Sequence, residues 1–131
     1  MKSIHELKEI VNSYASKIGA PSKYLPTYEE PRGDGHPCIK LDYLVYQIVY
    51  VERGKELDRK TSFNLDDLLY DVFSDVTALM AMDYEVENRV SNKDPRILLF
   101  KKQIEFLGKL SEDFKTKGKK EIKDIEKRFP Y

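Results

Sequence analysis

The fold is decided by residues 46–85, which read YQIVYVERGKELDRKTSFNLDDLLYDVFSDVTALMAMDYE. Up to residue 62 the side-chain pattern repeats every two residues on both sides of a turn at Arg53-Gly54. This pattern is typical of two strands joined by a tight turn. From residue 65 onward the apolar residues recur every three or four positions, which is typical of an amphipathic helix. The stretch therefore predicts a β-hairpin that leads directly into a long helix.

The segment before this hairpin predicts a long loop and one more strand. Residues 20–37 hold four of the six prolines and two glycines, a composition that favours an ordered surface loop. Ile39, Leu41 and Tyr43 then alternate with polar residues, which indicates a half-buried strand. Residues 45–51 are apolar at nearly every position, as expected of a central strand that is covered on both faces.

The turn at residues 53–54 also predicts a strand register. A tight turn there places Tyr50 opposite Leu57. By the same spacing, Ile48 lies opposite Arg59. The third strand is then polar on one face, which is typical of a strand at the edge of a sheet. The sequence thus predicts a three-stranded antiparallel meander.

Helices are predicted before and after the meander. Apolar residues with helical spacing occupy residues 4–18, and Ser3 and Glu6 have the spacing of a capping box. The helix that begins at residue 65 has a wide apolar stripe and breaks at residues 92–95, and two further helices divided at Ser111 follow it. We therefore expect one α+β domain over residues 1–131, with an N-terminal helix, the meander, and three C-terminal helices packed on the sheet.

The composition excludes several classes of protein. Basic and acidic residues number 23 each, so no net charge attracts the chain to nucleic acid or to an anionic membrane. The single cysteine, Cys38, has no partner for an internal disulfide and no second thiol for a structural zinc site. The sequence shows neither the apolar core of a signal peptide nor a membrane span. We expect a cytoplasmic protein that holds no metal and no cofactor.

One pair of side chains suggests catalysis. Asp34 and His36 are two residues apart, a spacing at which an acid can orient a general base. A small hydrolase that uses this pair is therefore one alternative. Residues 33–37, however, have the Gly, Asp and Pro content of a turn. The sequence contains no P-loop, dinucleotide fingerprint, nucleophile elbow or HExxH motif. We expect no catalytic residues and no enzymatic activity.

Charge is distributed unevenly along the chain. Residues 64–98 contain 3 basic and 8 acidic side chains, whereas residues 99–131 contain 10 basic and 6 acidic ones. In a structural interpretation, the first acids stabilise a helix N-terminus and the lysines solvate a helix face. In a functional interpretation, acids beyond the first helical turn and the tip of the hairpin bind a protein partner. The candidate partner-binding residues are Glu52, Arg53, Glu56, Asp71, Asp75 and Asp83.

Several short segments occur in the order found in one known family. They are Ile18-Gly19-Ala20-Pro21 with Leu25-Pro26, Asp34-Gly35, Glu52-Arg53-Gly54, residues 66–73, residues 76–85, Leu98-Leu99-Phe100 with Gln103, residues 107–111 and the closing Phe129-Pro130-Tyr131. Through them nearly the whole chain resembles the immunity protein 63 family of bacterial polymorphic-toxin systems. The resemblance implies a non-catalytic bacterial protein that binds a cognate toxin domain and occludes its active or binding surface. We expect such a protein to act as a monomer. A generic protein-binding adaptor or regulatory module is the main alternative.

Overall fold

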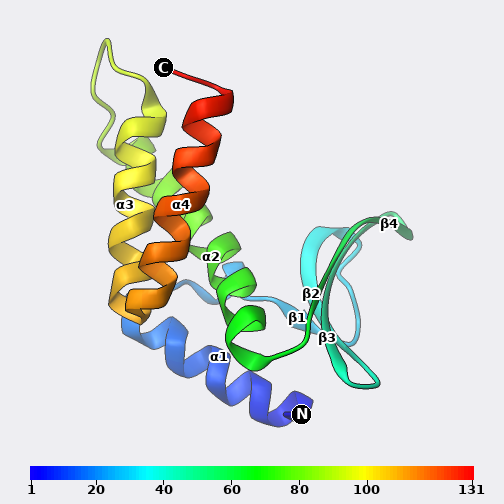
Figure 1. The fold of residues 1–131 in the computed structure, drawn as a ribbon. Helices are drawn as coiled ribbons and strands as arrows, with labels where there is room; N and C mark the ends of the chain where they lie inside the picture. Colours follow the sequence, from blue (N-terminus) through cyan, green and yellow to red (C-terminus); the bar gives the residue numbers. More distant parts are fainter. The chain divides into compact units, whose positions relative to one another are not determined.

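The computed structural model describes residues 1–131 and shows an α+β fold, which confirms the predicted class (Figure 1). Four α-helices and four strands follow one another, with a short 3-10 helix near the start. In chain order the elements are α1 (Ile4–Ile18), η1 (Ser22–Tyr24), β1 (Thr27–Tyr28), β2 (Asp34–Asp42), β3 (Val45–Glu52), β4 (Lys55–Ser62), α2 (Leu65–Glu87), α3 (Pro95–Leu110) and α4 (Glu112–Arg128).

The chain forms two compact units. The first comprises Met1–Ser16 and Pro21–Val72, and so contains most of α1, the sheet and the first turns of α2. The second comprises Lys17–Ala20 and Phe73–Tyr131, and so contains the rest of α2 with α3 and α4. Helix α2 is continuous through the division at residues 72 and 73.

The sheet has four strands in the order β1-β2-β3-β4, so the predicted three-stranded antiparallel meander is wrong in strand number and in direction. Strand β1 pairs in parallel with β2, through Thr27 opposite Cys38 and Tyr28 opposite Ile39, whereas the other two pairings are antiparallel. Both β1 and the start of β2 lie in the segment that was predicted to be a loop. A strand of two residues is too short to show alternation, and Gly35 and Pro37 give the start of β2 the composition of a turn.

The hairpin turn is confirmed, but its predicted register is wrong by one residue. Arg53 and Gly54 have φ angles of 51° and 78°, as a two-residue turn of type I′ requires. Tyr50 lies opposite Asp58, and Ile48 lies opposite Lys60. The register shifts next to Tyr50, because β4 contains a bulge that the sequence pattern does not reveal. Strand β4 is the sheet edge, as predicted.

Tyr43 was predicted to lie in a half-buried strand, and this is also wrong. Strand β2 ends at Asp42, which pairs with Val45, so Tyr43 and Leu44 form a two-residue turn. Tyr43 has a φ angle of 57° and its side chain is 96% exposed. The alternation of Ile39 and Leu41 therefore stops one residue earlier than the sequence suggests.

Most buried residues of the first unit come from α1, β2, β3 and the start of α2. They are Leu7, Val11, Ala15, Cys38, Ile39, Tyr46, Ile48, Val49, Leu68, Leu69, Tyr70 and Val72. The predicted capping box is present in α1. The backbone N–H of Ser3 donates to Glu6 Oε1 at 3.1 Å, and the backbone N–H of Glu6 donates to Ser3 Oγ at 3.2 Å. The capping box thus satisfies two backbone donors at the start of α1, at its exposed end.

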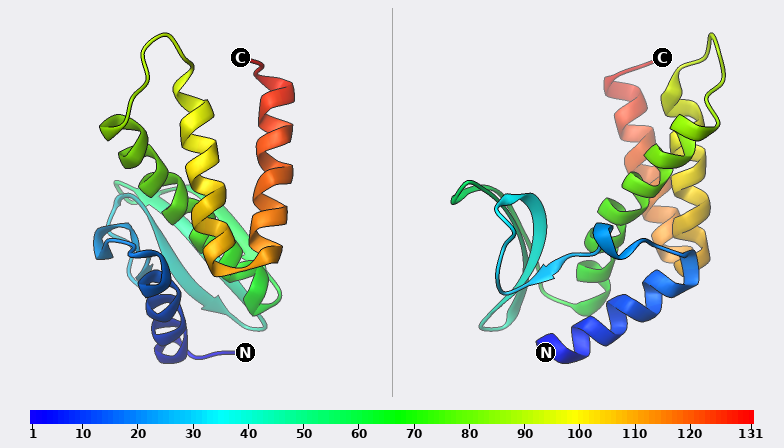
Figure 2. Two further views of the ribbon diagram at one scale, coloured as in Figure 1. Left: turned by 90° about the vertical axis from the view of Figure 1, so that its left-hand side faces the viewer. Right: turned by 180° about the vertical axis from the view of Figure 1, so that it is seen from behind.

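In the second unit α3 and α4 form an antiparallel pair that meets at Ser111 and separates toward the far ends of the two helices (Figure 2, left). Ser111 caps α4 as predicted, because its Oγ accepts a hydrogen bond from the backbone N–H of Phe114 at 3.3 Å. Gln103 links α3 to α2, since its Nε2 donates to the carbonyl of Ser74 at 3.1 Å and to Thr77 Oγ1 at 3.3 Å. The three predicted C-terminal helices are therefore confirmed.

Candidate functional site

The tip of the β3–β4 hairpin carries three of the predicted partner-binding residues, Glu52, Arg53 and Glu56, and all three are exposed. The backbone N–H of Arg53 donates to the carbonyl of Gly33 at 2.9 Å, which fixes the turn. The guanidinium of Arg59 donates to Glu56 Oε1 at 2.5 Å and to Oε2 at 3.1 Å, and these hydrogen bonds hold the pKa of Glu56 below its ordinary value. Glu52 and Arg53 are thus the tip charges best placed to meet a partner.

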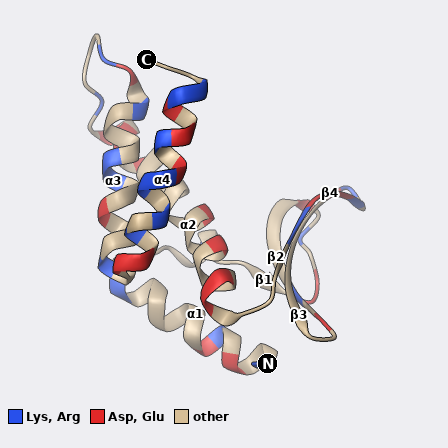
Figure 3. Ribbon diagram, in the orientation of Figure 1, with Lys and Arg blue, Asp and Glu red and all other residues tan.

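The other three predicted residues lie on α2, where Figure 3 shows a series of acidic positions. Asp71 belongs to the first unit and accepts a hydrogen bond from Ser62 Oγ at 3.2 Å. Asp75 and Asp83 belong to the second unit, and Asp83 is the exposed member of that pair. Residues four apart share a helix face, so Asp71 and Asp75 lie on the same side of α2, whereas Asp83 points about 80° away from Asp75.

The structure does not bring the hairpin tip and Asp71 together. Glu56 lies near the start of β4, and Ser62, which donates to Asp71, lies at its end. Ser62 lies six positions along the strand from Glu56, which corresponds to about 20 Å. Within the first unit, the hairpin tip and Asp71 are therefore separate candidate surfaces.

An apolar cluster that sequence reasoning missed lies at the Ser62 end of the sheet. Tyr43 is 96% exposed, Leu44 is 80% exposed and Phe63 is 79% exposed. Because Tyr46 pairs with Ser62, the Tyr43-Leu44 turn and Phe63 lie at the same end of β3 and β4. Large exposed apolar side chains in a cluster are typical of interaction surfaces. The turn at Tyr43-Leu44 was missed because the alternation of apolar residues continues through Tyr43, so the sequence pattern does not show where β2 ends.

The Asp34–His36 pair does not have the geometry of an acid and its base. The carboxylate of Asp34 accepts a hydrogen bond from the backbone N–H of His36 at 3.2 Å, and Arg32 Nη2 donates to it at 2.6 Å. The ring Nε2 of His36 lies 2.6 Å from the carbonyl oxygen of Leu25, which can only accept, so Nε2 carries the proton. The Asp34 carboxylate is therefore bound by Arg32 and by the backbone at the start of β2, while the imidazole of His36 is bound to the carbonyl of Leu25.

No group of three or more His, Cys, Asp or Glu side chains is placed to hold a metal ion. None of the helices combines the length and the apolar character that a membrane span requires.

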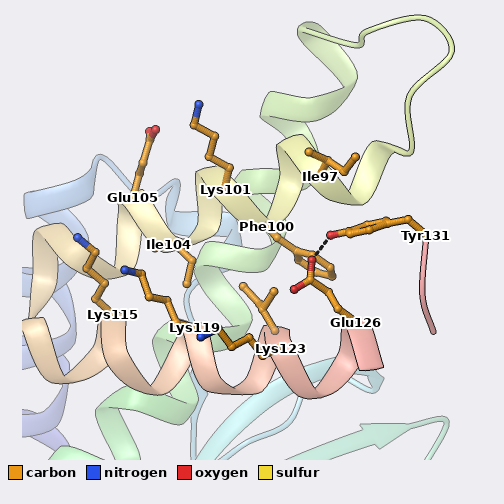
Figure 4. Close-up of a pocket in the computed structure, with 11 residues that line it drawn as sticks. Ile97, Phe100, Lys101, Ile104, Glu105, Lys115, Lys119, Lys123, Glu126 and Tyr131 are labelled. Carbon is orange, nitrogen blue, oxygen red and sulfur yellow. Dashed lines mark hydrogen bonds between the residues drawn. The ribbon is translucent and has the colours of Figure 1, made fainter. Parts of the chain in front are cut away.

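The second unit contains a groove between α3 and α4, with a volume of about 740 Å³ (Figure 4). Its apolar residues are Ile97, Phe100 and Ile104 of α3 and Ile122 of α4. Charged side chains line it as well: Lys101 and Glu105 on α3, and Lys115, Lys119, Lys123 and Glu126 on α4. We call this surface the α3–α4 groove.

The acids of the α3–α4 groove are satisfied within the chain, whereas its lysines are not. Lys102 Nζ donates to Glu105 Oε2 at 3.1 Å, and Tyr131 Oη donates to Glu126 Oε2. None of the four groove lysines, Lys101, Lys115, Lys119 and Lys123, forms an ion pair within the chain. On α4 three of them repeat every four residues, a like-charge row that costs an isolated helix about 0.2–0.5 kcal/mol per pair. Sequence reasoning took the α4 lysines as a solvated face.

The C-terminal residues lie at one end of the groove. Arg96 Nη1 donates to the carbonyl of Phe129 at 2.6 Å, and the Arg96 guanidinium lies 4.7 Å from the centre of the Tyr131 ring. The hydrogen bond to Glu126 raises the pKa of Tyr131 to about 12. Arg96 is itself held by Asp94, whose Oδ2 accepts from Arg96 Nη2 at 2.9 Å. A chain of polar contacts from α3 thus orders the last residues beside the groove.

The second unit also contains a largely buried carboxylate, Glu85, whose side chain is 6% exposed. Arg89 satisfies it with two hydrogen bonds, from Nη2 to Oε1 at 2.8 Å and from Nε to Oε2 at 3.0 Å. These bonds hold the pKa of Glu85 below its ordinary value of 4.5. Because the folded pKa is the lower one, Glu85 stabilises the fold above its ordinary pKa, and this contribution is lost as the pH falls through the folded pKa.

We expect the substitution Arg89→Leu to raise the pKa of Glu85, because the carboxylate then stays shielded from water without its partner. Acid unfolding of this variant should begin at a higher pH than that of the native protein. Carboxyl carbon chemical shifts recorded during an acid titration measure the pKa directly, and Arg128→Leu, at an exposed arginine of α4, is the control. An unchanged pKa in the Arg89 variant would show that the ion pair does not control this group.

Comparison with known proteins gives one match. The sequence model of a family described as immunity protein 63 matches residues 42–124, which is more than half of the 131-residue chain. The matched segment begins at the end of β2 and ends within α4, so it includes the hairpin, α2 and most of the α3–α4 groove. Searches of curated proteins and of solved structures gave no match. The chain belongs to the immunity protein 63 family.

Proposed function

We propose that this protein is a bacterial immunity protein that binds a cognate polymorphic toxin and neutralises it by covering the toxin's active or binding surface. The observation that carries the proposal is the family match over residues 42–124. Exposed charges at the hairpin tip and on α2, and the exposed apolar cluster of Tyr43, Leu44 and Phe63, are features that protein interfaces use. The protein acts as a monomer in the cytoplasm of the cell that produces the toxin.

The proposed mechanism is occlusion without catalysis. A standard interface needs about 800 Å² of surface on each partner and a rigid scaffold that presents it. The proposed contact residues are those of the hairpin tip, Glu52, Arg53 and Glu56, and those of α2, Asp71, Asp75 and Asp83. Acidic residues of α2 would attract a basic surface on the toxin and speed the encounter. His36 has no part in this mechanism, because its ring is bound to the carbonyl of Leu25.

The proposal is tested by co-expression with the toxin domain encoded beside this gene. Cells that carry the toxin domain alone should stop growing, and cells that also carry this chain should grow and yield a complex of the two proteins. The variant His36→Ala, in which the imidazole is removed, should protect equally well. Failure of the native chain to restore growth or to co-purify with the toxin domain would refute the proposed function.

We also propose that residues 1–131 unfold as one cooperative domain, although the chain forms two compact units. Helix α2 belongs to both units, so unfolding of either one disrupts a helix that the other requires. Far-ultraviolet circular dichroism and tyrosine fluorescence should therefore report one common thermal transition, with equal calorimetric and van't Hoff enthalpies. Two separate transitions would show that the units are independent domains.

A further inference from the structure

We propose that the α3–α4 groove binds an acidic amphipathic helix of the toxin domain. The inference rests on the proposed function and names a surface that differs from the predicted acidic one. It follows from three properties of the groove, namely its length, its apolar floor and its unpaired lysines.

The groove has the dimensions of a helix-binding site. Its lining residues on α4 extend from Lys115 to Glu126, which is about three helical turns or 16 Å. The pair is closest near Ser111, where a Cβ on Gly108 would come within 3.2 Å of Lys115 Cδ, and the helices separate from there (Figures 2 and 4).

The floor of the groove favours an apolar helix face. Ile97, Phe100 and Ile104 recur at the spacing of one side of α3, and Ile122 of α4 lines the same groove. Ile97 is 46% exposed, so this floor is incompletely covered by the chain itself. The groove walls are helices, whose backbone groups are already hydrogen-bonded, so they offer no edge to an extended peptide. A helix satisfies its own backbone and needs only apolar side chains at the i, i+3, i+4 and i+7 positions.

The charges of the groove select an acidic partner. Lys115 and Lys119 extend from α4 toward α3, whereas Lys101 and Glu105 project outward from α3 (Figure 4). Four lysines and two glutamates line the groove, and Glu105 is paired with Lys102, so the groove carries a net positive charge. Carboxylates that flank the apolar face of a bound helix would pair with them. Nucleic acid fits less well, because phosphates gain nothing from a floor of isoleucine and phenylalanine.

The binding test uses the full chain and a designed probe. The probe is a labelled peptide of about 14 residues with leucines at helical spacing and glutamates on both flanks. We expect it to bind the native protein, and we expect Lys119→Glu combined with Lys123→Glu to weaken binding at least about tenfold at low salt. The matched control is Lys120→Glu combined with Lys127→Glu, which makes the same charge change at exposed positions of α4 outside the groove. It should stay within about twofold of the native protein.

Four results of this test would overturn the inference. The first is that the acidic peptide does not bind the native protein. The second and third are that a peptide with lysine in place of glutamate, or an RNA duplex, binds as tightly as the acidic peptide. The fourth is that the control variant loses as much affinity for the acidic peptide as the Lys119/Lys123 variant does. Self-association of the native protein that disappears in the Lys119/Lys123 variant would overturn it too, because the groove would then hold a second copy. Circular dichroism verifies that each variant is folded.

The toxin domain separates this inference from the proposed function. If the native chain binds the toxin domain and the Lys119/Lys123 variant binds it at least about tenfold more weakly, both stand. If the native chain and the variant bind it equally, the groove inference fails and the proposed function survives. If the native chain does not bind the toxin domain at all, the proposed function fails, and the groove inference fails with it.

Discussion

Replacing Phe73 with alanine is expected to lower the free energy of unfolding by about 3–5 kcal/mol. Phe73 is fully buried, and it is the largest of the fully buried side chains. Its removal loses the transfer free energy of the ring and leaves a cavity that the remaining side chains fill only partly. Urea denaturation measures the loss, and the midpoint of thermal unfolding should fall by roughly 10–20 °C.

The chain offers a matched control for this experiment in Phe63, which is 79% exposed. Phe63→Ala removes the same ring from water-accessible surface, so we expect a change within about 0.5 kcal/mol. Similar losses in the two variants would contradict the assignment of Phe73 to the core. Because α2 contributes to both units, the Phe73 variant should also keep a single transition if the chain is one domain.

Replacing Asp71 and Asp75 with lysine is expected to slow association with the toxin domain by about tenfold or more at low ionic strength. The substitution reverses two charges that lie four residues apart on α2 and so replaces attraction with repulsion during the encounter. The difference should shrink as salt is added, since exposed charges are screened beyond a Debye length of about 8 Å at physiological ionic strength. Stopped-flow association rates measured over a salt series test this.

Two controls make the result specific. The double variant Glu29→Lys with Glu30→Lys changes the net charge equally at exposed positions after β1, and should leave the rate within about twofold of the native value. The pair Asp75→Lys with Asp83→Lys keeps the hydrogen bond from Ser62 to Asp71 and separates charge effects from damage to the fold. An unchanged association rate in both acidic-face variants would remove α2 from the proposed interface.

The parts of the fold that the sequence predicted are those where local rules act alone. The turn at Arg53-Gly54 needs two positive φ angles, and a capping box or a serine N-cap depends on residues three apart. The parts that were missed depend on residues distant in the chain. Strand β1 exists because Thr27 and Tyr28 meet the open edge of β2, and the bulge in β4 shifts the register by a single residue.

The candidate site was less predictable than the fold for the same reason. The sequence identified the acidic positions of α2, but the separation of Glu56 from Asp71 along β4 depends on strand pairing. The exposure of Tyr43 depends on where β2 ends. The lysine row on α4 was visible in the sequence, yet its meaning depends on Ile104 and Phe100 of the neighbouring helix. Surfaces formed by two elements require the packing of both.

The most direct test of occlusion without catalysis is a titration of toxin activity with the purified protein. The account predicts that activity falls in proportion to the protein added, reaches its minimum at about one molar equivalent, and does not change with longer incubation. Toxin released from the complex by denaturation and refolding should regain its activity. Progressive loss of activity at a small fraction of an equivalent would contradict the account, because it would mean that each molecule of this protein inactivates many toxin molecules.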